Sequence, residues 1–265
     1  MLQTVILLLT LIFTPTWAQP PSRDWFLNFS DLIRDNKVDQ AFFADDDDEE
    51  PKYKDFLNTP GMGDGTFTSL QWAAKMGSKS WTVEALIDNG GDPTLPHEGT
   101  LTTPSMFAAR EGNSRTLASI LSKIESPGAE LSKVDEHGNT ALHLAALTTG
   151  NAMAATAMLK STPDHAFALI ENNNGNTALQ VASFYDSSGS FVSTLLSDEG
   201  VRESINKEAP NGRTALHLAI AHGIKDVVEI LLKSGAKVDG VAVEIASEKG
   251  HEDLEEYLRG DGGEL

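Results

Sequence analysis

Carboxylates and histidines are the side chains through which this chain could do chemistry. A run of six carboxylates occupies Asp45–Glu50, and seven histidines are spread along the sequence. Calcium prefers several oxygen ligands, so the run is a candidate for weak binding of calcium or of a mineral surface. It lacks the glycine and the ligand spacing of a high-affinity calcium loop; the simpler interpretation is a solvated, disordered loop. The candidate ligands are Asp45, Asp46, Asp47, Asp48, Glu49 and Glu50.

No catalytic motif accompanies these residues. The stretch HEDLE at His251–Glu255 has no second histidine, and GMGDG at Gly61–Gly65 lacks the spacing of a nucleotide-binding loop. The chain has no cysteine, which excludes thiol catalysis and Cys-based zinc sites. We therefore expect no enzyme activity, no cofactor and no firm metal site.

A repeated alanine organises most of the sequence. It recurs in steps of 35, 37, 37, 37 and 27 residues, each time followed by a second small or apolar residue. A regular period of this kind is typical of repeat architectures. The alanines are Ala73, Ala108, Ala145, Ala182, Ala219 and Ala246.

Each repeat predicts a pair of helices. In GNTALHLAA, Gly138 permits a tight turn with positive φ, and Thr140 is suited to cap a helix N-terminus. Leu142, Ala145 and Ala146 then share one helix face. In KDVVEILLKSGAKVD a second helix follows, with an apolar stripe of Val227, Ile230, Leu231 and Leu232 and with Gly235 at its C-terminus. The pattern predicts an all-α repeat solenoid.

These motifs resemble the ankyrin repeat family. The match extends through Gly212–Asp239 and includes GNTALHLAA and TTPSMFAAREGN, within a resemblance over residues 31–260. It implies about five fuller repeats with short hairpin loops, between degenerate N- and C-terminal caps. The family period is about 33 residues, so we expect the additional residues to lengthen the helix–helix turns or the loops. Ser105 replaces a usual leucine, and Gln71, Met106 and Gln180 replace a usual histidine.

The predicted organisation has five parts. Residues 1–18 are a signal peptide and 19–30 an N-terminal segment; 31–60 form a cap helix pair, with a turn at Asn36 and the acidic insertion 45–50. Residues 61–260 are the solenoid and 261–265 a flexible tail. Leu32, Ile33, Val38, Ala41 and Phe42 should face inward in the cap, and Trp72 and Trp81 should lie in the core.

The resemblance also implies where a partner would bind. Family contacts come from the hairpin tips and from positions after the alanine pair, and we expect Phe184 and Tyr185 to carry most of the binding energy. Aromatic residues at an interface often cost about 2 kcal/mol or more when truncated. The alternative is that one ring folds back into the core. The other candidates are His137, Asn139, Asn174, Asn176, Asn211, Arg213 and His222.

The histidines outside these candidates have structural interpretations. The resemblance implies that His143 and His217 hydrogen-bond between neighbouring repeats. His97 and His251, like His137 and His222, should be solvated or rim residues, and His165 suggests no specific role.

Composition and the N-terminus bear on location and partners. The apolar run Val5–Phe13 and a cut after Ala18 predict export, so that Gln19 begins a secreted chain without a membrane span. A formal net charge of −19 argues against nucleic acid as a partner. Asn28-Phe29-Ser30 is an acceptor sequon for glycosylation.

The leading hypothesis is a secreted, monomeric, non-catalytic protein that binds a protein partner. The alternatives are an acidic extracellular matrix or mineral-associated protein, a secreted effector or venom-type component, and an intracellular protein whose apolar N-terminus is not used for export.

Overall fold

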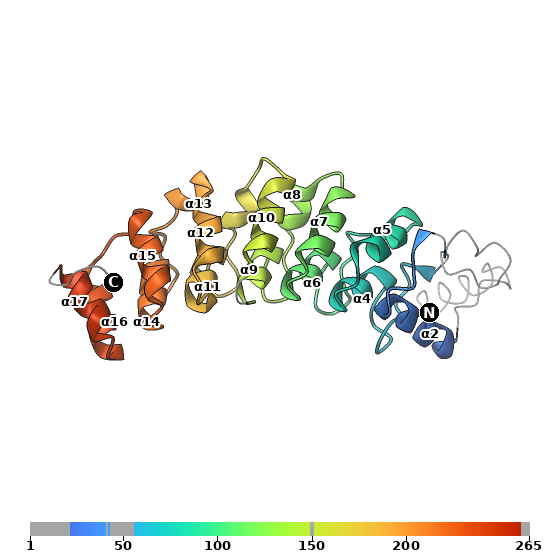
Figure 1. Ribbon diagram of the computed structural model, residues 1–265, viewed down its shortest axis with the longest axis horizontal. Coiled ribbons are helices and arrows are strands. Elements are labelled where there is room, and N and C mark those ends of the chain that lie inside the picture. Colours follow the sequence, from blue (N-terminus) through green and yellow to red (C-terminus); the bar gives the residue numbers. More distant parts are fainter. Residues whose placement is uncertain (1–21, 41, 43–55, 149–150, 261–265) are drawn as a thin grey trace, which may run out of the picture.

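The computed structural model describes residues 22–40, 42, 56–148 and 151–260. Its helices form one elongated stack, with α2 at one end and α17 at the other (Figure 1). The expected all-α repeat solenoid is confirmed: no strand is present in the part of the chain that the structure describes.

Two rows of helices build the stack (Figure 1). Successive helices pack on one another throughout the first row and from α5 to α15 in the second, and each repeat contributes one helix to each row. The first row is α4 (Ser69–Lys75), α6 (Pro104–Arg110), α9 (Ala141–Ala146), α11 (Ala178–Tyr185), α14 (Ala215–Ala221) and α16 (Gly240–Lys249). The second row is α5 (Ser80–Asp88), α7 (Ser114–Ser122), α10 (Ala152–Ser161), α12 (Ser190–Leu196), α15 (Lys225–Lys233) and α17 (Glu252–Arg259).

The repeated alanines all lie on the first-row helices. All six are completely buried in one continuous core. A methyl side chain allows the backbones of neighbouring helices to approach closely, which explains why the small residue recurs at a fixed phase. Val227 and Leu231 of the predicted second-helix stripe are also completely buried.

Threonines start the first-row helices from α4 to α14, as predicted for Thr140, and Asp239 starts α16. The Thr214 hydroxyl accepts a hydrogen bond from the His217 amide at 3.4 Å, while the Thr214 amide donates to His217 Nδ1 at 3.1 Å. Each side chain thereby satisfies a backbone group that the helix leaves unpaired. Thr140 and His143 form the corresponding pair.

The additional residues of the long repeats form helical turns. Short helices follow the second row: α8 (Pro127–Leu131), the 3₁₀ turn η2 (Ala166–Leu169) and α13 (Glu199–Glu203). η2 contacts both α8 and α13. Leu131, Phe167 and Val201 bury their side chains there, so the longer connections between repeats, which were expected, contain helical turns that extend the core.

The N-terminal cap begins earlier than predicted. α2 (Arg23–Arg34) lies partly in the stretch 19–30, because Ser22 caps it by accepting a bond from the Trp25 amide. The chain turns at Asn36, where φ is +55°. Ile33 and Val38 are completely buried, as expected. Leu32 and Phe42 pack partly buried against the core; Ala41, the acidic run, residues 1–18 and 261–265 lie outside the described residues.

The two tryptophans differ from expectation. Trp72 packs against the core and donates from Nε1 to the Ser30 carbonyl at 3.2 Å, but it is only partly buried. Trp81 is 52% exposed, so its assignment to the core was wrong. α5 buries Thr82, Val83 and Leu86, and that phase turns Trp81 away from the core.

Candidate functional site

A groove of about 480 Å³ crosses the middle of the stack. It lies between the first-row helices α9, α11 and α14 on one side and three hairpin tips on the other. We call it the central groove. Its lining residues are His137, Asn139, Leu147, Asn172, Asn173, Asn174, Asn176, Gln180, Val181, Phe184, Tyr185, Asn211 and Leu218.

Hydrogen bonds within and between the hairpins hold the asparagine side of the groove. Asn172 Oδ1 accepts bonds from the backbone amides of Asn174 and Asn176, and its Nδ2 donates to Asn139 Oδ1 at 3.0 Å. The Asn173 amide donates to the His137 carbonyl of the preceding hairpin at 3.0 Å. The first two tips therefore form one preorganised wall, and Pro210 of the third hairpin lies next to Gly175.

Aromatic and aliphatic side chains form the opposite side. Tyr185 is 45% exposed and Leu147 is 42% exposed, while Phe184 is half-buried. The ring centroids of Phe184 and Tyr185 are 4.7 Å apart, and the ring centroids of Phe184 and His222 are 3.6 Å apart. Neither ring folds into the core. The aromatic side chain of this stretch that is buried in the core is Phe191.

The structure thus brings most of the predicted contact residues together. His137, Asn139, Asn174, Asn176, Phe184, Tyr185 and Asn211 all line the central groove. His222 does not line it but packs against Phe184 at its edge. Arg213 is half-buried next to Asn211, to whose Oδ1 its amide donates at 3.0 Å, and it is not a lining residue.

The two repeat histidines connect neighbouring repeats as the resemblance implied. His143 Nε2 lies 2.9 Å from the Asn176 carbonyl, and His217 Nε2 lies 2.9 Å from Asp239 Oδ1. Burial lowers the pKa of His143, against the opposing effect of its bond to Asn176. The neutral ring that results accepts at Nδ1 and donates at Nε2 toward a hairpin that forms the groove.

Gln180 also connects neighbouring repeats, with its side-chain amide in place of a histidine ring. Its Oε1 accepts from the Thr177 amide at 2.8 Å, and its Nε2 donates to the carbonyls of Lys207 and Arg213 at 3.0 and 3.1 Å. A glutamine can replace a histidine here because it too carries one acceptor and a donor.

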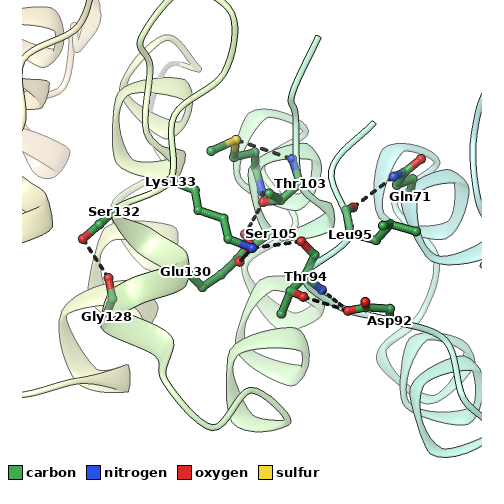
Figure 2. A network of polar contacts seen from close by, with 11 residues as sticks. Gln71, Asp92, Thr94, Leu95, Thr103, Ser105, Gly128, Glu130, Ser132 and Lys133 are labelled. Atoms are coloured by element: carbon green, nitrogen blue, oxygen red, sulfur yellow. Dashed lines mark hydrogen bonds and ion pairs between the residues drawn. The ribbon is translucent and has the colours of Figure 1, made fainter. Parts of the chain in front are cut away.

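A cluster of buried Ser105, buried Glu130 and half-buried Lys133 lies in the repeat where serine replaces the usual leucine. The Ser105 hydroxyl donates to Glu130 Oε1 at 2.6 Å, and Lys133 Nζ lies 2.8 Å from Glu130 Oε2 (Figure 2). Lys133 also donates to the Thr94 carbonyl at 2.9 Å. Ser105 is completely buried, so its hydroxyl meets no substrate and the cluster joins α6 to α8 structurally.

Two further histidines have partners that sequence reasoning missed. His97 is 9% exposed, not solvated, and its ring nitrogens lie 3.0 and 3.1 Å from the hydroxyls of Thr100 and Thr66. His165 Nδ1 pairs with Asp198 across η2 and α13. His97 and Thr66 lie 31 residues apart in sequence, and His165 and Asp198 lie 33 apart, so only the superposition of successive repeats could have revealed these two pairs.

The structure does not test the calcium expectation, because Asp45–Glu50 lies outside the described residues. No group of three or more metal-ligating side chains occurs in the ranges that the structure describes. Asn28 is exposed on α2, whereas Ser30 of the same sequon is buried, with its hydroxyl donating to the Phe26 carbonyl at 2.8 Å. No helix among the described residues is both long and apolar enough to cross a membrane.

Comparison with known families agrees with this architecture. A family model described as ankyrin repeats (3 copies) matches residues 70–167, 164–242 and 187–262. A search of the curated proteins finds no match. The helix pairs, the stacked hairpins and this match over most of the chain place the protein in the ankyrin repeat family.

Proposed function

We propose that this protein binds a partner protein through the central groove, without catalysis, and that it does so outside the cell. Ankyrin repeats indicate a protein-binding role in general. The particular support here is the meeting of exposed Tyr185 and half-buried Phe184 with a preorganised asparagine wall in one groove. Aromatic anchors beside fixed polar groups are typical of interaction hot spots.

The non-catalytic part of the proposal follows from the polar groups near the groove. His137 is highly exposed, and the Glu136 carboxylate lies 3.9 Å from its ring. His143, which bonds to the hairpin of the groove, is completely buried. A partner surface is therefore a better match to the groove than a reacting small molecule.

The extracellular part rests on the predicted signal peptide. We expect the protein recovered from its source to begin at Gln19 and to be found outside cells. N-terminal mass spectrometry of cell, fluid and matrix fractions tests this. A chain that begins at Met1 inside cells would contradict the extracellular proposal and leave groove binding unaffected.

The groove can be tested with variants used as bait. Tyr185→Ala and Phe184→Ala should each weaken capture of the partner by about 2 kcal/mol, roughly 30-fold in Kd. Met153→Ala is a matched control, because Met153 is 69% exposed on α10 and does not line the groove. Partner capture that survives both groove substitutions would refute the assignment of the binding site.

A further inference from the structure

The central groove is uncharged in a strongly charged protein. Charged residues make up 22% of the chain, yet none of the described residues that line the groove is Asp, Glu, Lys or Arg. An ionic ligand would find no counter-charge in this lining. The segment that occupies it should therefore be uncharged along the groove, although its flanks can complement the formal net charge of −19.

Some of the groove's amides are committed to the fold and others are not. Asn139, Asn172 and Asn173 are used in bonds between hairpins. The side chains of Asn174 and Asn176 make no hydrogen bond within the described part of the protein, and Asn211 engages only its Oδ1. Each has Nδ2 donors available, so the wall is suited to carbonyl oxygens of a ligand.

Across from these donors lies the aromatic surface. Tyr185 and Phe184 stand next to each other, with His222 behind Phe184 and Leu147 on the neighbouring repeat. Flat apolar rings bind prolines and other compact side chains without requiring charge. The groove thus presents amide donors on one side and rings on the other.

The spacing of the repeats favours one backbone conformation for the occupant. Packed helices lie about 8–10 Å apart, and α9, α11 and α14 pack successively. A polyproline II helix advances about 3.1 Å per residue with three residues per turn, so one turn spans about one repeat. Its carbonyl groups have no internal partner, and aromatic-lined grooves are known to recognise this conformation.

We propose that the central groove binds a proline-rich, uncharged segment of the partner protein in the polyproline II conformation. Carbonyl oxygens of the segment accept from Asn174, Asn176 and Asn211, and proline rings lie against Tyr185 and Phe184. The inference rests on the proposed function and names the chemistry of its partner.

The experiment is a titration of the isotope-labelled full chain, followed by NMR, with three probes. They are an end-blocked decaproline, an end-blocked Gly/Ser decapeptide and a linear neutral hexasaccharide. Decaproline should bind saturably and shift the side-chain amide signals of Asn174, Asn176 and Asn211. The Gly/Ser peptide should bind at least tenfold more weakly, because it is not preorganised.

Variants then connect binding to the groove. Tyr185→Ala should weaken decaproline binding at least tenfold, and Asn174→Ala should weaken it about threefold while leaving the fold intact, because the Asn174 side chain has no bond to lose. Met153→Ala should leave binding unchanged. Equal binding of both peptides, binding of the hexasaccharide alone, or no saturable binding at millimolar concentration would overturn the inference.

The two proposals fail differently. If capture of the partner still depends on Phe184 and Tyr185 but decaproline does not bind, the polyproline inference is wrong and the proposed function stands. If capture does not depend on these residues, both are wrong.

Discussion

At the scale of single residues, one position of the repeat connects the first-row helices α4, α9, α11 and α14 to the next repeat. Histidine occupies it at 143 and 217, and glutamine at 71 and 180. Gln71 donates to the Leu95 carbonyl at 3.0 Å, just as Gln180 donates to the next hairpin. Met106 has no such donor, and it is next to Met106 that Ser105, Glu130 and Lys133 form their cluster.

The glutamine position makes a direct prediction. Gln180→Ala should lower the free energy of unfolding by about 1–3 kcal/mol, because the partly buried carbonyls of Lys207 and Arg213 each lose a donor. Gln180→His should cost less than about 1 kcal/mol, since histidine can supply both the acceptor and the donor. Urea unfolding followed by circular dichroism measures both. Equal losses for the two variants would show that packing, not the hydrogen bond, matters at this position.

The Ser105–Glu130 pair predicts energetic coupling. Ser105→Ala should cost about 1.5–3 kcal/mol, because the bond goes to a charged and buried group. In the double variant Ser105→Ala/Glu130→Ala the losses should not add, with a coupling energy of about 0.5–3 kcal/mol. Unfolding curves of the wild type, both single variants and the double variant provide the cycle. Additive losses would mean that the two side chains act independently.

The His165–Asp198 pair predicts a pH dependence of stability. Burial opposes the charge on both groups. The bond to Asp198 nevertheless raises the pKa of His165, and bonds from the Val201 amide and His165 lower the pKa of Asp198. A histidine whose pKa is raised by folding stabilises the folded state fully below its unfolded pKa of about 6.5. This stabilisation is lost as pH rises through the folded pKa. An aspartate whose pKa is lowered by folding stabilises the folded state fully above its unfolded pKa of about 3.9. This stabilisation is lost as pH falls through the folded pKa.

The pair should therefore stabilise the fold most between about pH 4 and pH 6.5. Asp198→Asn keeps a side chain that can cap α13 but removes the charge. The difference in stability between the wild type and this variant should be largest in that window and should decrease as pH rises above it. Thermal unfolding across pH measures this, with Glu248→Gln as an exposed charge control. A difference that does not change with pH would contradict the role of the ion pair.

At the scale of elements, the helix rows were predictable and the connecting segments were not. The alanine period and the threonine caps are local patterns, so they located α9 and α14 and their partners. The turns α8, η2 and α13 depend on contacts among themselves and with α10 and α12, which no single period reports. For the same reason the groove residues were predicted individually, while the bonds among Asn139, Asn172 and Asn176 were not.

Two hairpin glycines form a matched pair at this scale. Gly175 and Gly212 have nearly the same φ, +72° and +74°. A Cβ atom added at Gly175 would lie 2.3 Å from Pro210, whereas a Cβ atom added at Gly212 would have no atom within 4 Å. Gly212→Ala should cost about 1–2 kcal/mol through backbone strain alone. Gly175→Ala should cost more and should also weaken partner binding, because it moves the hairpin of Asn174 and Asn176. Equal losses of stability would show that contact between the tips is not important.

At the scale of the whole molecule, the stack distributes its stability along one dimension. Each repeat packs only on its neighbours, so terminal units must cover an apolar face while exposing a polar one. α16 and α17 fulfil this at the C-terminal end: Ala242, Ile245 and Ala246 face inward, and α17 has an acidic first turn. The sequence indicated this cap through its incomplete repeat and its charge.

A substitution in that cap should therefore have graded effects along the stack. Ile245→Asp places a charge in the α14–α16 contact, where the side chain is only 4% exposed, and should release α16 and α17. Hydrogen exchange should then show lost protection in α16 and α17, a smaller loss in α14 and α15, and none in α4 and α6. Glu244→Asp, at an exposed position on the same helix, should change nothing. A uniform loss of protection from α4 to α17 would mean that the solenoid unfolds as one cooperative unit, and then damage at the cap would also disable the whole of the central groove.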